Sequence, residues 1–75
     1  MYSYQEIAEI LFLYGQKYVS YGLKVYYISY GIYEEICHIS NITLDKDSLV
    51  VLAQNCTKGQ LYPIHIQDVI EDFLS

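Results

Sequence analysis

Four side chains in this sequence have the chemistry of zinc ligands, or of a nucleophile and its base: Cys37, His38, Cys56 and His65. Structural zinc sites usually combine two close pairs of ligands, each pair separated by a few residues. Here one pair is adjacent and the other lies nine positions apart. Adjacent residues of a strand point to opposite faces, so Cys37 and His38 are poorly placed to hold one ion. We therefore expect no metal and no other cofactor, and interpret both cysteines as small buried hydrophobic residues.

Covalent catalysis has equally little support. A reactive cysteine needs a base within hydrogen-bonding reach and a third group that orients the base. The sequence contains no Gly-x-Ser-x-Gly elbow, no phosphate-binding loop and no glycine-rich dinucleotide turn. The adjacent Glu34 and Glu35 are more typical of a solvated edge than of a catalytic carboxylate pair. We therefore expect that the protein is not an enzyme and has no catalytic residues.

The composition points instead to contact with another protein. The chain has 75 residues, with ten tyrosines, nine carboxylates, only four cationic side chains, all of them lysine, and a net charge of −5. Tyrosine offers a large apolar ring with a polar tip at a low cost in ordering entropy, which suits a contact surface. Negative charge without arginine disfavours nucleic acid and favours a protein partner with a basic surface.

Length and hydropathy predict a single small domain that covers residues 1–75. Apolar residues make up 53% of the chain and charged residues 17%, which lies outside the composition of disordered proteins. No apolar run approaches the 18 or more residues of a membrane span, and the N-terminus lacks the basic segment of a secretory signal. We therefore expect a cytoplasmic protein without membrane contact.

The hydrophobic pattern predicts an α+β fold that begins with an amphipathic helix. Ser3 and Glu6 have the spacing of a capping box, and Gly22 is placed to end the helix. The runs Leu23–Ile28 and Leu49–Ala53 are typical of strands, Leu61–Ile66 of an edge strand because it contains Pro63, and a short helix is expected from about Gln67. Residues 32–42 fit a helix or a strand, and we favour a strand. These elements predict an antiparallel sheet of three or four strands packed against both helices. The expected core stripe of the first helix is Ile7, Ile10, Leu11, Tyr14, Tyr18 and Tyr21.

Two contact surfaces follow from these elements. A second ridge on the expected first helix predicts a helix-mediated homodimer, unless the sheet or the last helix covers the ridge within one monomer. A surface of tyrosines and carboxylates predicts the site for the protein partner. The predicted dimer interface is Ala8, Phe12, Gly15 and Val19, and the predicted partner-binding residues are Tyr26, Tyr27, Tyr30, Tyr33, Glu34, Glu35, Asp68, Glu71 and Asp72.

The function that these features favour is that of a non-catalytic acidic interaction module. Small size and negative charge resemble those of inhibitors encoded by phages or mobile elements, which mask the basic surface of a nucleic-acid-binding protein. Two alternatives remain open at this point. In the first, the protein is a self-associating structural subunit. In the second, it is a small-ligand sequestering protein with a site between subunits.

Overall fold

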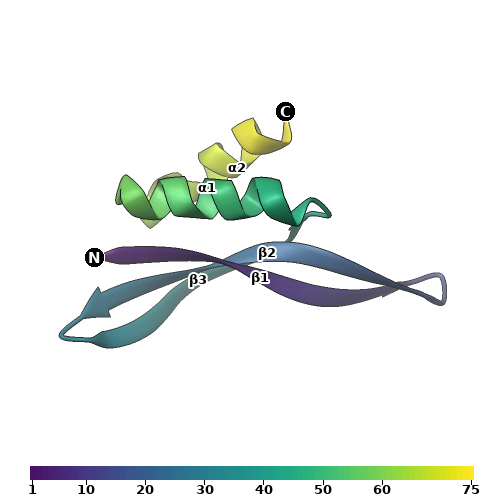
Figure 1. Ribbon diagram of the computed structural model, residues 1–75, viewed down its shortest axis with the longest axis horizontal. Helices are drawn as coiled ribbons and strands as arrows, with labels where there is room; N and C mark the ends of the chain where they lie inside the picture. The colour runs from purple at the N-terminus through teal and green to yellow at the C-terminus, as the bar shows by residue number, and fades with distance from the viewer.

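The computed structural model describes residues 1–75 and shows a three-stranded antiparallel sheet with two helices on one face (Figure 1). The strands follow one another along the chain and across the sheet in the order β1-β2-β3. Two short hairpin turns join them, and both helices follow β3. The elements are β1 (Tyr2–Leu13), β2 (Gln16–Ser29), β3 (Ile32–Thr43), α1 (Lys46–Lys58), the 3₁₀ turn η1 (Pro63–His65) and α2 (Ile66–Leu74).

The predicted N-terminal helix is wrong, because residues 2–13 form β1 and residues 16–29 form β2. The segment from Ile10 to Tyr14 is apolar at every position, so it fits a period of two as well as a helical period. Gly22 does not end a helix. It is buried in β2 where β3 passes so closely that a Cβ atom would lie 2.3 Å from the carbonyl oxygen of Ile39.

Both hairpins turn on the same dipeptide, tyrosine followed by glycine. Tyr14 and Gly15 have φ angles of 52° and 75°, and Tyr30 and Gly31 have φ angles of 51° and 73°. Two successive residues with positive φ are the requirement of a type I′ turn, whose twist matches that of the flanking strands. The glycines meet this requirement without strain, whereas the tyrosines adopt a conformation that is uncommon for a bulky residue.

The predictions for the rest of the chain are wrong for two segments and confirmed for two others. Leu49–Ala53 belongs to α1 and not to a strand, and Leu61–Ile66 forms an irregular segment and η1 instead of an edge strand. The side chain of Asp45 caps α1 by accepting a hydrogen bond from the backbone N–H of Ser48. The C-terminal helix is confirmed as α2, and residues 32–42 form the favoured strand, β3.

The core lies between the helices and the inner face of the sheet. From α1, Leu49, Ala53 and Cys56 recur at steps of four and three residues, so they share the side that faces the sheet. α2 adds two buried isoleucines at a spacing of four. The complete core consists of Tyr4, Leu23, Val25, Ile42, Leu49, Ala53, Cys56, Ile66 and Ile70.

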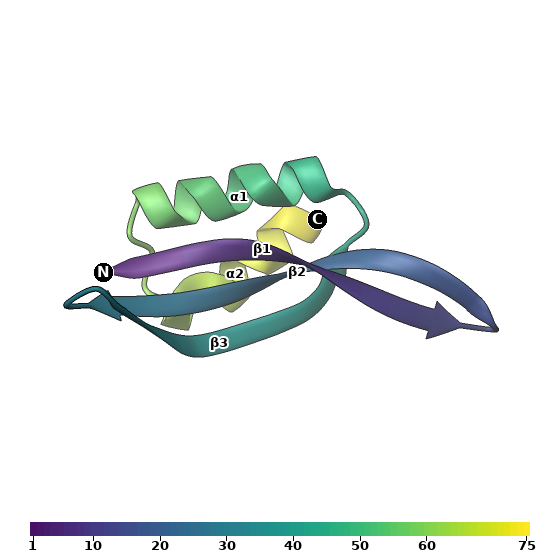
Figure 2. The same cartoon turned by 60° about the horizontal axis from the view of Figure 1, so that its bottom comes forward.

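The helices cover only part of the sheet. The molecule measures 44 × 27 × 19 Å, and β3 pairs with β2 only from Tyr21 to Ser29. Figures 1 and 2 show the second half of β1 and the first half of β2 projecting beyond both helices and beyond β3. We call this projection, residues 8–19, the arm. No helix of the structure is long and apolar enough to cross a membrane.

Candidate functional site

Six of the ten tyrosines gather at the end of the molecule that carries the β2–β3 turn. The ring of Tyr2 lies 5.5 Å from that of Tyr27 and 5.9 Å from that of Tyr62, measured between centroids. On the opposite face of the sheet, Tyr26 and Tyr33 form an edge-to-face pair at 6.0 Å. We call this region the tyrosine end and define it as Tyr2, Tyr26, Tyr27, Tyr30, Tyr33 and Tyr62, with Glu34 and Glu35.

Exposure varies across the tyrosine end in a way that suits contact. Tyr30 is fully exposed at the turn, and Tyr33 retains 58% of its accessible surface. Tyr27 is exposed as well, while Tyr2 and Tyr26 are half-buried supports for their ring partners. Ring–ring packing therefore holds five of the six tyrosines in place, whereas Tyr30 has no ring partner.

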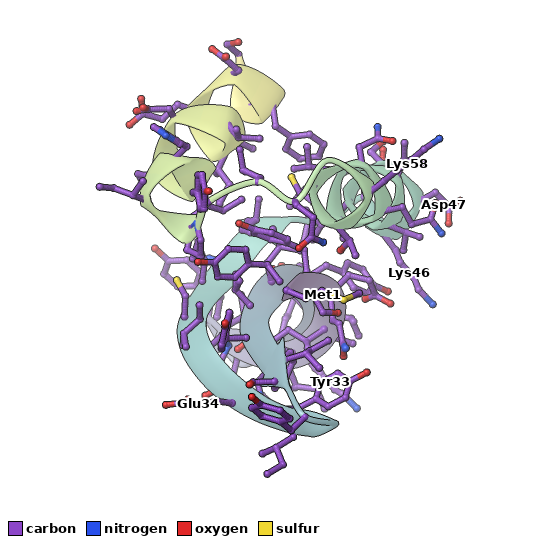
Figure 3. The ribbon with its side chains drawn as sticks, turned by 90° about the vertical axis from the view of Figure 1, so that its left-hand side faces the viewer. Met1, Tyr33, Glu34, Lys46, Asp47 and Lys58 are labelled. Atoms are coloured by element: carbon purple, nitrogen blue, oxygen red, sulfur yellow. The ribbon has the colours of Figure 1, made fainter.

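The charges of this region are unevenly neutralised. The ammonium group of Lys24 lies 3.2 Å from the carboxylate of Glu35, and this hydrogen-bonded pair raises the pKa of Lys24. Glu34 forms no ion pair. Figure 3 shows Glu34 on the opposite side of the molecule from Lys46 and Lys58, which project from α1.

The remaining predicted acidic residues lie on α2. Asp68, Glu71 and Asp72 are all exposed, and none of them forms an ion pair. α2 carries no lysine, and it lies on the same side of the molecule as Glu34 in Figure 3. One flank of the molecule therefore carries unpaired carboxylates from two separate elements.

The predicted dimer ridge falls on the arm. Its helical form is wrong, because Ala8 and Phe12 lie on β1 and Val19 on β2. The register pairs Ile10 with Val19 and Phe12 with Lys17, so Ala8, Phe12 and Val19 still share one face, with Gly15 in the turn. Phe12 is 73% exposed, and nothing within the chain covers this face.

A polar cluster crosses the open face of the sheet above Gly22. The Nε2 atom of His38 lies 3.5 Å from Oε2 of Glu9 and 3.3 Å from Oγ of Ser40, and the Ser40 hydroxyl donates to the same carboxylate oxygen at 3.1 Å. A nucleophile triad places the serine and the carboxylate on different ring nitrogens of the histidine. Here both groups meet Nε2, and the serine proton is bound by the carboxylate. The cluster therefore lacks the geometry of a triad and serves as a cross-strand link.

The four candidate metal ligands do not converge. Cys37 lies on the inner face of β3 and His38 on the outer face, while Cys56 lies on α1 and His65 on η1. The structure contains no group of three or more histidine, cysteine, aspartate or glutamate side chains that could hold an ion. Both cysteines are unpaired, and burial raises the pKa of the Cys56 thiol, which disfavours the thiolate needed for a nucleophile.

The only pocket is an open groove of about 380 Å³ between α1 and α2. Ser48, Val51, Leu52, Asn55 and Phe73 line it. No ionisable side chain is among them, so the groove offers no acid or base to a ligand. It is also formed within one chain, unlike the predicted ligand site between subunits.

Sequence reasoning missed two members of the tyrosine end. Tyr2 and Tyr62 are distant in the chain from the β2–β3 turn, and only the antiparallel register, which places Tyr2 opposite Tyr27, brings them together. The dipeptide Tyr-Gly occurs three times, at residues 14–15, 21–22 and 30–31. The first and third copies form the hairpin turns, where glycine supports the positive φ angle, but the second lies inside β2, so the dipeptide alone does not identify a turn.

The chain belongs to a family of unknown function, DUF6514, whose profile matches residues 2–75. No curated protein and no solved structure shows significant similarity to this chain.

Proposed function

We propose that this protein is a non-catalytic, acidic interaction module that binds a partner protein with a basic surface. The observation that carries the proposal is the gathering of six tyrosines and two glutamates at one end of the molecule, with unpaired carboxylates along the adjoining flank. Binding would cover the basic surface of the partner. For a partner that binds nucleic acid through that surface, the module would act as an inhibitor.

The tyrosines supply the area for such a contact. Aromatic residues dominate the energetically important positions of protein interfaces because each buries a large surface with few rotatable bonds. Tyr30 is the clearest candidate for an anchor. It is fully exposed at the tip of the β2–β3 hairpin, whose strands also carry the exposed Tyr27 and Tyr33. Exposed residues of surface turns often carry binding functions.

The carboxylates would attract the basic surface of the partner and orient it during association. Glu34, Asp68, Glu71 and Asp72 form no ion pair, so their field extends from this flank toward solvent. Such a field attracts a basic surface and raises the rate of association, with a strong dependence on ionic strength. We place the protein in the cytoplasm, since a reducing compartment suits its two unpaired cysteines.

The test is affinity capture from the cells that make the protein, followed by binding kinetics with the purified captured partner. Tyr30→Ala is expected to weaken binding about tenfold or more, because it removes an interface anchor. Glu34→Lys is expected to slow association and to flatten its decline with salt. Both changes lie at exposed positions, so the fold should be unaffected.

Tyr14→Ala is the matched control. Tyr14 occupies the same position of the same turn type as Tyr30, with the same exposure, at the other end of the molecule. It should therefore reproduce any effect on hairpin stability without affecting partner binding. The proposal fails if Tyr30→Ala and Tyr14→Ala bind alike, or if binding is indifferent to salt and to Glu34→Lys.

A further inference from the structure

We propose that a row of side chains on the inner face of the sheet, Tyr2, Tyr27 and Glu34, binds an arginine side chain of the partner protein. The inference rests on the proposed function, because it names the group on the basic surface that the tyrosine end contacts. It comes from comparing two neighbouring rungs of the β2–β3 hairpin, where a rung is a pair of residues that lie opposite each other in the register.

The rung on the outer face already holds a cation. Tyr26 of β2 lies opposite Glu35 of β3. Lys24 precedes Tyr26 by two residues, so the two side chains share a face, and the Lys24 ammonium group lies 3.2 Å from the Glu35 carboxylate. The hydrogen bond to Glu35 and the charge of that carboxylate raise the pKa of Lys24, and Tyr26 adds to the effect. The chain itself therefore supplies the cation for this tyrosine and glutamate.

The next rung has the same two residue types and no cation. Tyr27 lies opposite Glu34, one position nearer the turn on each strand, so this rung is on the inner face. The residue that precedes Tyr27 by two positions is Val25, which is completely buried in the core. Glu34 is exposed and forms no ion pair. The inner rung thus presents a tyrosine and a carboxylate without the cation that the outer rung contains.

The other cations of the chain lie elsewhere. The N-terminal ammonium group donates to a backbone carbonyl oxygen at 3.4 Å, and Figure 3 shows Met1 well apart from Glu34. Lys46 and Lys58 project from α1 on the far side of the molecule, and Lys17 lies on the arm. The sequence contains no arginine. An arginine bound at this row therefore belongs to a different protein and not to a second copy of this chain.

Tyrosine rings extend the inner rung across the sheet. Tyr2 lies opposite Tyr27, and the Tyr2 ring is 5.5 Å from that of Tyr27 and 5.9 Å from that of Tyr62. Tyr27 and Tyr62 are 40% and 65% exposed, so ring surface is open to a ligand. Neighbouring strands are about 4.8 Å apart, so the row from Tyr2 on β1 to Glu34 on β3 spans about 10 Å. The stem of an extended side chain can lie across Tyr27 while its charged head reaches Glu34.

This combination of rings and a carboxylate favours arginine over lysine. The guanidinium group is planar, so its face can stack on a ring while its edge donates hydrogen bonds to a carboxylate. An ammonium group has no face to stack and is more strongly hydrated. Contact of a cation with an exposed aromatic ring strengthens binding about two- to fivefold.

The test uses short peptides as probes, so it does not require the partner. A peptide of alternating arginine and glycine, its lysine counterpart and its uncharged citrulline counterpart are titrated into the full chain at low salt, and the tyrosine ring resonances are followed by NMR. The arginine peptide should shift the resonances of Tyr2, Tyr27 and Tyr62 and bind about two- to fivefold more tightly than the lysine peptide. The citrulline peptide should shift none of them.

Matched variants separate this row from the overall negative charge. Glu34→Gln should weaken binding of the arginine peptide about three- to fivefold. Glu35→Gln makes the same change in net charge on the neighbouring rung and should have little effect, because Lys24 already pairs with that carboxylate. Tyr27→Leu should remove the preference for arginine. Tyr18→Leu should not, although Tyr18 lies on the same strand and is 39% exposed.

Equal binding of the arginine and lysine peptides, shifts confined to other parts of the molecule, or equal effects of Glu34→Gln and Glu35→Gln would each overturn the inference. The proposed function would survive that result if binding of the captured partner still depends on Tyr30 and on salt. Conversely, peptide binding at this row together with partner binding that ignores Tyr30→Ala and salt would support the arginine site and refute the proposed function.

Discussion

Gly22 offers a direct test of how closely the strands approach in the middle of the sheet. A Cβ atom at this position would lie 2.3 Å from the Ile39 carbonyl oxygen, 2.8 Å from Oε1 of Glu9 and 3.2 Å from Cα of Ser40. Real Cβ atoms essentially never come within 3.0 Å of such neighbours, so Gly22→Ala forces β2 and β3 apart by about 0.7 Å or more. The nearest obstacle is backbone, which cannot rotate away as a side chain can.

The expected loss of stability follows from this displacement of the strands. Overpacking by one methyl group typically destabilises a protein by about 1–3 kcal/mol, and a clash with backbone falls at the upper end of that range. For a domain of this size a loss of about 3 kcal/mol lowers the unfolding midpoint by about 15 °C. We expect this shift in thermal unfolding followed by circular dichroism.

Gly59→Ala is the control for Gly22→Ala. Gly59 has an ordinary φ of −82°, and its added Cβ would lie 3.3 Å from the carbonyl oxygen of Asn55. The change should alter stability by less than about 1 kcal/mol. If Gly22→Ala unfolds within a few degrees of the wild type, the close approach of β2 and β3 at Ile39 is refuted.

Two further predictions concern tyrosines whose environments differ. Tyr4 is buried, its hydroxyl donates to the carbonyl oxygen of Leu61 at 2.6 Å, and burial raises its pKa from 10.0 to about 12. The folded state therefore holds this proton more tightly than the unfolded state, so the free energy of unfolding should fall by about 2–3 kcal/mol as pH rises from about 10 to 12. Tyr4→Phe should remove this part of the decline in pH-dependent urea unfolding, and an equal decline in both proteins would contradict the burial of the phenol. Tyr14→Asn should raise stability by about 0.5–1 kcal/mol, because asparagine tolerates the φ of 52° that strains tyrosine and Asn-Gly is the favoured pair of a type I′ turn. A lower urea midpoint for Tyr14→Asn would show that the tyrosine ring stabilises the turn.

The sequence correctly predicted the elements whose hydrophobic pattern fits only one period, that of a helix or that of a strand. α2 is short and its apolar residues fit a helix alone, and residues 25–28 are β-branched or aromatic and form part of β2. The first 22 residues misled because capping-like residues at Ser3 and Glu6 and an unbroken apolar run fitted a helix equally well. The apparent cap glycine, Gly22, is needed for a reason that no local pattern contains, the close passage of β3 at Ile39, 17 residues further along the chain.

The candidate site likewise contains some residues that the sequence could group and others that only the fold brings together. Tyr26, Tyr27, Tyr30 and Tyr33 are near one another in sequence and surround one hairpin, so local reasoning was enough to group them. Tyr2 and Tyr62 join them only through the sheet register and the path of the chain after α1. Likewise Glu9, His38 and Ser40 meet because three strands pair across the sheet, and no spacing in the sequence indicates it.

The relative lengths of strands and helices explain why the arm is uncovered within the monomer. A helix of 13 residues extends about 20 Å, whereas a strand of 12 residues extends about 40 Å. Since α1 runs along the sheet in Figure 1, it covers about half of β1 whatever its side chains are. A sheet built only to support this core would end its strands, or become polar, where the helix ends. β1 instead continues with Ile10, Leu11, Phe12 and Leu13, which contribute nothing to the buried core. The apolar side chains of the arm therefore lie beyond the reach of the helices, and Ile10, Phe12 and Leu13 are exposed on the surface of the monomer.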